Sequence, residues 1–127
     1  MRSPQQEVFT LCRRQAVELY GKDIVYDYTP FDTPVPFIII GEAFNQDIDS
    51  KSQINVRLQQ TIHFYHPVKH RGTLEKQILD YKRAIREIKH TKRFYITVEN
   101  ISSRVIQDNS TDTPLLHGIL EIEFYIE

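Results

Sequence analysis

The chain of 127 residues has one cysteine, four glycines and no long apolar run. A single cysteine excludes an internal disulfide and is typical of a reducing compartment. No apolar stretch approaches the roughly 20 residues of a membrane-spanning helix, and the first residues lack the apolar region of a signal peptide. The glycines are scattered, so they cannot form a phosphate-binding loop. These absences predict a soluble domain without membrane contact, either cytosolic or assembled in the cytosol.

An excess of charge of one sign is also missing. The chain has 16 Lys and Arg against 17 Asp and Glu, a net charge of -1, which argues against a dedicated nucleic-acid-binding protein. Hydrophobic residues make up 40% and charged residues 26% of the chain, as is ordinary for a globular protein. The length predicts a single domain over residues 1–127 with one core.

Residues 74–88 have the clearest pattern, and the rest of the predicted fold is arranged around them. Apolar side chains recur there at helical spacing and form one stripe: Leu74, Ile78, Tyr81, Ile85 and Ile88. The stripe needs an apolar surface to pack on, and only the strand-like segments on either side of it offer one. Gly72 or Thr73 is predicted as the N-cap of this helix.

A second amphipathic helix is predicted over residues 4–20. Its start combines a capping box with a proline at the first helical position, in Ser3, Pro4 and Gln6. Gly21 is a typical residue at a helix end. Cys12 lies on the apolar stripe, so we predict a buried structural thiol rather than a nucleophile.

The strands are predicted from alternating patterns and apolar runs. They cover residues 23–28, 37–41, 54–66, 94–99 with a continuation over 101–107 after a kink or bulge, and 120–126. Residues 42–53 are predicted as a long loop or an extended hairpin tip, and a loop of this length is often associated with function or mobility. Residues 108–114 are predicted as a turn-rich loop. The predicted fold class is therefore α+β, with one largely antiparallel sheet and two amphipathic helices packed on it.

No residue pattern identifies a catalytic or cofactor site. Either of two serines could on paper form a Ser-His-Asp hydrolytic triad with one histidine and one aspartate. These residues are Ser102, Ser103, Asp108 and His117. Neither serine lies in a G-x-S-x-G motif, and so small a set occurs by chance. Glu121 and Glu123 share one face of a strand, as paired acid–base carboxylates would, although a solvated strand face explains them better. We expect no enzymatic activity and no cofactor.

Three histidines, His63, His66 and His70, raise the question of a metal site. His63 and His66 are three residues apart in a predicted strand, so their side chains should point to opposite faces. No CxxC or HExxH motif accompanies them. We therefore expect polar surface histidines near a strand end and no metal ligands.

Positive charge is concentrated between Lys69 and Arg93. This segment contains nine basic and three acidic residues, a net charge of +6, so the remainder of the chain carries -7. Two copies with such opposite regions attract each other, which suits a head-to-tail interface that closes a ring. A solvated helix explains the pattern equally well. Nucleic-acid contact through this helix, with Tyr or Phe stacking on bases, is a third alternative.

Two sequence blocks occur together in this chain, TPVPFIIIGE at residues 33–42 and DNSTDTPLLHGILE at residues 108–121. Between them, an alternating strand ends in HFYHP, and Arg71-Gly72 precedes the central amphipathic helix. With these features nearly the whole chain resembles a family of small tail proteins of long-tailed phages of Gram-positive bacteria. The genes of that family lie just before the gene of the major tail protein, where a tail terminator is expected.

The resemblance implies a structural virion protein without catalytic residues. Tail terminators of this kind are α+β proteins that form a hexameric ring on the head-proximal end of the tail tube. Such a ring would stop the addition of major tail protein, present a surface to the head-completion (stopper) protein, and let genomic DNA pass without specific binding. Another neck protein, such as the stopper itself, is the alternative within the same class.

The resemblance also suggests where contacts would be made. Six residues are expected at subunit or tube interfaces: Asp47, Asp49, Arg83, Arg86, Asp108 and Asn109. The expected docking segments are residues 42–53 and 107–114. The two aspartates of the first segment would repel the DNA backbone if they faced the lumen. One of the two arginines would pair with an acidic residue of the neighbouring subunit.

Overall fold

The computed structural model describes residues 3–28, 33–48 and 55–127. In chain order the elements are α1 (Pro4–Tyr20), β1 (Val25–Tyr26), β2 (Phe37–Ile48), β3 (Asn55–Pro67), α2 (Arg71–Arg86), β4 (Ile96–Asp108) and β5 (Leu115–Ile126), with 3₁₀ turns at Lys22–Ile24 and Val68–His70. The strands form one sheet in the order β1-β2-β3-β5-β4. β1 is parallel to β2, and the other neighbouring strands are antiparallel. The predicted α+β fold is confirmed.

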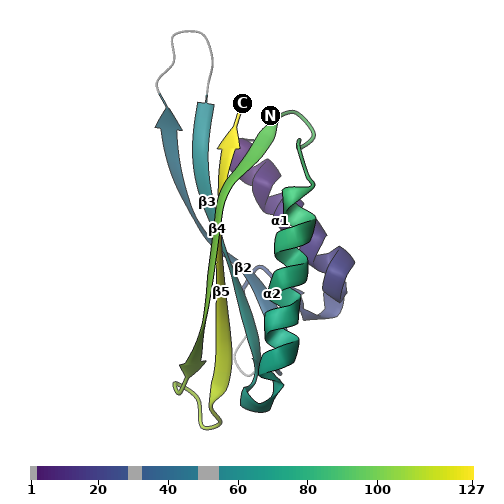
Figure 1. Ribbon diagram of the computed structural model, residues 1–127, viewed down its shortest axis with the longest axis vertical. Helices are drawn as coiled ribbons and strands as arrows, with labels where there is room; N and C mark the ends of the chain where they lie inside the picture. The colour runs from purple at the N-terminus through teal and green to yellow at the C-terminus, as the bar shows by residue number, and fades with distance from the viewer. Residues whose placement is uncertain (1–2, 29–32, 49–54) are drawn as a thin grey trace.

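Both helices lie on the same face of the sheet (Figure 1). Alternate apolar side chains of β3 and β5 point to this face and meet the stripe of α2. The centre of the core consists of Leu58, Ile62, Phe64, Leu74, Ile78, Tyr81, Ile85, Leu120, Ile122 and Phe124. In the described part of the chain no helix covers the opposite face of the sheet, which we call the open face.

The helix α2 packs closely against the sheet at Gly118 on β5. A Cβ atom added there would lie 2.8 Å from Ile78 Cδ1 and 3.1 Å from Leu74 Cδ1. The first of these distances is shorter than carbon atoms normally approach. The missing side chain of Gly118 therefore lets Leu74 and Ile78 pack directly against the backbone of the sheet.

The helix α1 begins and ends as predicted. The Gln6 amide donates to Ser3 Oγ and the Ser3 amide donates to Gln6 Oε1, each at 3.2 Å, which completes the capping box. Gly21 follows the helix with a φ of 88°, which glycine adopts without Cβ strain. Cys12 is buried, as expected, and burial raises the pKa of its thiol to about 12. Its carbonyl accepts a hydrogen bond from the Tyr81 hydroxyl at 2.9 Å, which joins α1 to α2.

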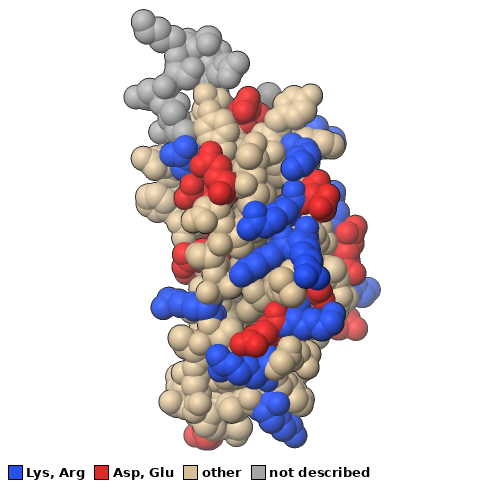
Figure 2. All heavy atoms as spheres, in the orientation of Figure 1, with Lys and Arg blue, Asp and Glu red and all other residues tan. Residues whose placement is uncertain are grey.

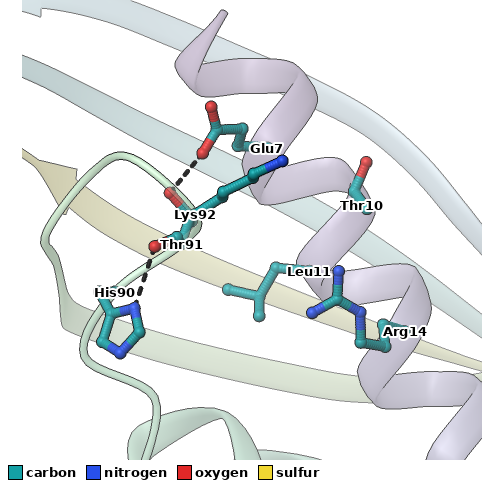
Figure 3. A pocket seen from close by; sticks show the side chains of 7 residues that line it. All are labelled: Glu7, Thr10, Leu11, Arg14, His90, Thr91 and Lys92. Carbon is teal, nitrogen blue, oxygen red and sulfur yellow. Dashed lines mark hydrogen bonds between the residues drawn. The ribbon is translucent and has the colours of Figure 1, made fainter. Parts of the chain in front are cut away.

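The buried carboxylate of Glu7 on α1 forms hydrogen bonds with the segment that follows α2. Glu7 accepts hydrogen bonds from Thr91 Oγ1 at 2.8 Å, from the Arg93 amide at 3.0 Å and from Arg93 Nε at 2.9 Å. Figure 3 shows the Glu7 carboxylate reaching from the helix to the loop beside it. The sequence interpretation did not single out Glu7, because its partners are more than 80 residues away in the chain.

Several predicted boundaries were wrong. The helix α2 begins at Arg71 and ends at Arg86, and its N-cap position is His70, which makes no side-chain capping bond, rather than Gly72 or Thr73. The strand predicted over 23–28 is only Val25–Tyr26, preceded by a 3₁₀ turn. β4 continues from Ile96 to Asp108 through a bulge between Val98 and Asn100, as the prediction allowed.

Of the two alternatives for residues 42–53, the loop was wrong for residues 42–48, which extend the β2–β3 hairpin. Residues 42–48 belong to β2 and pair with β3, while residues 49–54 lie outside the described residues. The segment is polar and lacks a strand pattern of its own, so the neighbouring strand β3 provides the pairing that keeps it extended. For the same reason β5 starts at Leu115 rather than at residue 120, because it pairs along β3 as far as Pro67.

Candidate assembly surfaces

One edge of the molecule is basic. Lys82 on α2 donates from Nζ to Ser103 Oγ on β4 at 2.7 Å, so the helix lies directly beside this edge strand. A shallow hollow of about 270 Å³ separates the two elements farther along. Figure 2 shows Lys and Arg side chains gathered over α2. We call Lys82, Arg83, Arg86 and Arg104 the basic edge.

The arginines of the basic edge have no acidic partner within the described residues. Arg83, Arg86 and Arg104 are exposed and form no salt bridge there. The acids of α2 are already paired along the helix, Glu75 with Arg71 at 3.2 Å and Asp80 with Lys76 at 2.9 Å. The basic edge is therefore available to an acidic partner from outside the described chain.

The open face carries polar and acidic side chains near the end where β3 begins. Arg57 lies 3.4 Å from Glu99 and 3.8 Å from Glu123, and Gln59 donates to Glu121 at 2.9 Å. The two glutamates of β5 thus share one face, as predicted, and each has a partner on β3. This surface is half-exposed and chemically suited to protein contact rather than to DNA, whose phosphates its carboxylates would repel.

A chain of hydrogen bonds crosses three strands of the open face. His63 Nδ1 lies 2.7 Å from His117 Nε2, and His63 Nε2 lies 2.7 Å from Glu42 Oε1. Tyr65 stacks on His117 with ring centroids 4.3 Å apart. Gly41 leaves room for this arrangement, because a Cβ there would lie 2.7 Å from His63 Cδ2. We call Glu42, His63, Tyr65 and His117 the histidine cluster.

Within the histidine cluster, burial, neighbouring charges and hydrogen bonds shift the pKa values of His117 and Glu42. Burial is the main cause that lowers the pKa of His117, and the neighbouring His63 and Arg104 lower it further, against Asp108 and Glu42, which raise it. The hydrogen bond from His63 lowers the pKa of Glu42. The sequence interpretation missed this cluster because its members come from three strands. No spacing in the sequence reveals which residues will lie opposite one another on neighbouring strands.

The expected arrangement of His63 and His66 is only partly correct. The two side chains do leave opposite faces, since His63 joins the open face while His66 faces α2 and bonds Gln77 Oε1 from Nε2 at 2.7 Å. His66 is 2% exposed, so the prediction of a surface histidine was wrong for this residue. Among the residues that the structure describes, no group of three or more His, Cys, Asp or Glu side chains is placed to hold a metal ion.

The residues with triad chemistry are not brought together. His117 bonds His63, Ser103 accepts from Lys82, and Asp108 accepts from the Ser110 amide at 2.8 Å. Ser102 lies opposite Glu121, whereas His117 lies opposite Ile106, four positions farther along β4. Within the described chain these residues form no nucleophile–base pair.

Five of the six expected interface residues are described, and they lie in three separate places. Asp47 is on β2 opposite Val56, and Asp49 lies outside the described residues. Asp108 ends β4 and Asn109 follows it, accepting from Gln107 Nε2 at 3.0 Å. The hydrogen bonds from Ser110 lower the pKa of Asp108. The remaining two, Arg83 and Arg86, belong to the basic edge.

These places lie at the two ends and one side of the sheet. Val56, at the β2–β3 end, pairs with Ile126, while Pro67 pairs with Leu115 at the end where β4 meets β5. The end of β2 and the turn after β4 are therefore at opposite ends of the molecule, as Figure 1 shows for the strands.

The fold is shared with a protein of a phage-like particle. A chain from a structure described as the virion of a native gene transfer agent particle matches 98% of this chain and 99% of its own length, with a TM-score of 0.68 and 12% identity. The likeness is one of fold. No protein-family model and no curated protein matches the chain. None of the described helices is long and apolar enough to cross a membrane.

Proposed function

We propose that the protein is a structural component of a phage or phage-like virion, located at the head-proximal end of the tail. In this role it forms a hexameric ring that caps the tail tube, ends addition of the major tail protein and binds the head-completion protein. Genomic DNA passes through the lumen of the ring without specific binding. The role is structural and requires no catalytic residues.

The match over the full length of a virion protein is the observation that carries this proposal. The match covers 98% of this chain and 99% of the gene transfer agent chain, so the likeness extends over nearly the whole of both chains. The sequence blocks at residues 33–42 and 108–121 support the tail terminator as the role, since they are among the features that resemble the phage tail family.

The geometry of the chain suits a ring between two partners. A terminator needs two axial surfaces, one for the tube and one for the head-completion protein, and lateral surfaces between subunits. Asp47 lies at one end of the sheet, and Asp108 and Asn109 lie at the opposite end. The basic edge runs along the side of the molecule and is suited to a neighbouring subunit.

The acidic residues near the end of β2 have a proposed role toward DNA. Asp47 and Asp49, placed at the lumen, would repel the phosphate backbone and keep the genome mobile. A ring structure with both side chains on its outer rim would contradict this placement.

The test is to add the protein to growing tubes of major tail protein. We expect tubes of bounded length with the protein at one end only, seen by electron microscopy of a tagged protein, and a hexameric mass in the bound state. Binding along the tube wall, or to heads without tails, contradicts the terminator role, and the second result favours the stopper alternative. A stable two-fold dimer also counts against a six-fold cap.

A nucleic-acid-binding module is the second candidate, and the basic edge is the observation that favours it. Such a module would bind DNA with an affinity that falls steeply as salt rises. Fluorescence anisotropy with labelled DNA distinguishes the two, because we expect a terminator to bind DNA weakly at physiological salt.

A further inference from the structure

The outer edge of β4 is free along most of the strand. β4 is the last strand in the order, so only β5 pairs with it. The segment before β4 covers its start, where the Ile96 amide donates to Lys89 O at 2.9 Å. Over residues 100–108 the register with β5 is regular, and no strand of the described chain lies on the outer side. Alternate residues there direct their N–H and C=O groups outward, which is the arrangement that an added strand requires.

A hollow lies beside this free edge. The hollow of about 270 Å³ between α2 and β4 is lined on the strand by Ser103, Arg104 and Val105, which follow one another in the chain. Successive side chains of a strand point to opposite faces, so a space that all three residues border lies at the edge of the strand. Leu79 of α2 contributes an apolar wall and is 45% exposed. An added strand with an apolar side chain would remove this surface from water.

The free edge carries positive charge on both faces of the sheet. On the helix side, Lys82 reaches β4 through a hydrogen bond of 2.7 Å, and its ammonium group has further donors for a carboxylate. Arg104 is exposed on the open face and forms no salt bridge within the described residues. The acidic residue that lines the hollow, Glu75, is already paired with Arg71 at 3.2 Å. The charges of this edge therefore match an acidic segment.

A second copy of the chain does not supply a matching strand. Two β4 edges would bring Lys82 and Arg104 of both copies together, and juxtaposed like charges oppose such a contact. The strand registers place Ala43 of β2 level with Ile101 of β4, and β2 continues from there toward the covered start of β4. In a ring, where all copies lie at equal height, the outer edge of β2 beyond Ala43 hardly overlaps the free edge of β4. The matching strand therefore has to come from another protein.

We propose that residues 100–108 of β4 bind an extended acidic segment of a partner protein in the virion, which joins the sheet as an additional strand. An apolar side chain of the segment fills the hollow beside Leu79, and its carboxylates meet Lys82 and Arg104. We call this free edge and the hollow the strand site. The inference rests on the proposed place in a virion, and it applies to a terminator and to a stopper alike.

Labelled peptides about as long as the free edge test the strand site directly. The probe alternates valine and glutamate, and its matched control alternates valine and lysine. Fluorescence anisotropy with the isolated protein should show that the acidic peptide binds at least about tenfold more tightly than the basic one. Equal affinities, or no binding of the acidic peptide at millimolar concentration, overturn the proposal.

Backbone methylation distinguishes strand pairing from simple attraction of an anion. A version of the acidic peptide with methylated backbone nitrogens keeps every side chain and charge but cannot donate hydrogen bonds to β4. Because pairing uses several backbone hydrogen bonds, we expect methylation to weaken binding at least about tenfold. An unchanged affinity would mean that the edge attracts negative charge without pairing, and would overturn the proposal.

Hydrogen exchange and charge reversal locate the bound peptide. The acidic peptide should slow exchange of the outward amides of residues 100–108. Lys82→Glu/Arg104→Glu is expected to weaken its binding at least about fivefold. Arg14→Glu/Lys22→Glu reverses two exposed charges elsewhere and is the matched control. Protection confined to other elements, or an equal effect of the control variant, contradicts the strand site.

The strand site is separate from the contacts proposed between ring subunits. Arg83 and Arg86 are not among the residues that line the hollow, so they remain available to a neighbouring subunit. Self-association of the protein that the acidic peptide inhibits would show that a second copy occupies the strand site, and would overturn the proposed partner.

The same measurements separate this inference from the proposed function. The peptides are tested on the isolated protein, whereas the cap is tested on growing tubes. A protein that caps tubes but binds no acidic peptide overturns the strand site and leaves the cap standing. A protein that binds the acidic peptide at residues 100–108 but does not cap tubes supports the strand site and contradicts the terminator role.

Discussion

Glu7 is charged and yet almost fully buried at the first turn of α1. Burial of the carboxyl raises its pKa, but the hydrogen bonds from Arg93 and Thr91 outweigh this, so the pKa of Glu7 lies below its ordinary value of 4.5. The folded state therefore favours the ionised carboxylate. The residue joins α1 to the segment that leads into β4, so it positions the start of an edge strand.

Replacement of Glu7 by glutamine is expected to lower the melting temperature by several degrees at neutral pH, because the amide cannot replace the charged bonds to Arg93. The contribution of Glu7 is present above its unfolded pKa and is lost as pH falls through the lower folded pKa. Thermal unfolding measures the difference in melting temperature between the wild type and Glu7→Gln. This difference should be smaller at about pH 3 than at about pH 7. Glu18→Gln, at an exposed position of the same helix, is the control and should change little.

His66 is a buried residue in its neutral form. Its Nε2 bonds Gln77 Oε1 at 2.7 Å, while Nδ1 is buried and has no hydrogen-bond partner among the described residues. Burial lowers its pKa below the ordinary value of 6.5, the bond to Gln77 partly opposes this, and the nearby His70 lowers it further. A proton on Nδ1 would be buried without an acceptor, so the folded state resists protonation.

The stability of the protein should therefore fall as pH drops below about 6.5, where the unfolded chain binds a proton that folded His66 does not. Urea unfolding at about pH 8 and about pH 5 measures this change, and we expect it to be smaller in His66→Phe. His117, whose pKa is also lowered, retains part of the acid sensitivity. An identical pH dependence in His66→Phe and in the wild type would rule out this role.

At the scale of elements, the position of α2 on the sheet depends on Gly118. Gly118→Ala would bring a methyl group against Ile78 and Leu74, and we expect a loss of about 1–3 kcal/mol of unfolding free energy, as overpacking typically costs. Gly72→Ala is the matched control, since its Cβ meets nothing within 4 Å. That change should stabilise the helix by roughly 0.5–1 kcal/mol. Chemical denaturation of both variants decides the prediction, which fails if they shift in the same direction.

At the scale of the whole molecule, the unpaired charges of the basic edge distinguish assembly from folding. Arg83 and Arg86 are exposed and without salt bridges in the described chain, so they contribute little to the stability of one subunit. In a ring they are expected to meet acids of the neighbouring subunit. Removal of these contacts should change the oligomer and leave the monomer intact.

The double variant Arg83→Glu/Arg86→Glu is expected to weaken self-association by about 0.2–1 kcal/mol for each ion pair lost. The melting temperature should fall only slightly, because both arginines lie in the last turn of α2, where a cation stabilises the helix end. Added salt should weaken wild-type association in the same direction. Arg14→Glu/Lys22→Glu reverses two exposed charges elsewhere and serves as the control. Analytical ultracentrifugation measures the association. Equal effects of the two double variants would mean that the net charge of the protein, rather than the basic edge, governs self-association.

The local signals of this sequence were sufficient for the elements whose patterns are self-contained. The capping box at Ser3 and Gln6 satisfies helix-end groups within a few residues, and the stripe from Leu74 to Ile85 needs only helical periodicity. Boundaries set by pairing were not predictable in this way. Residues 42–48 became strand because β3 lies beside them, and no property of that segment alone indicates it.

By itself, then, the sequence determined the α+β class, the two helices, the burial of Cys12 and the concentration of positive charge around α2, because each depends on composition or short-range spacing. Only the tertiary structure decided that Glu7 is buried and that Glu42, His63 and His117 form a cluster. These features depend on which distant segments become neighbours, and strand order and register decide that only when the whole sheet has formed.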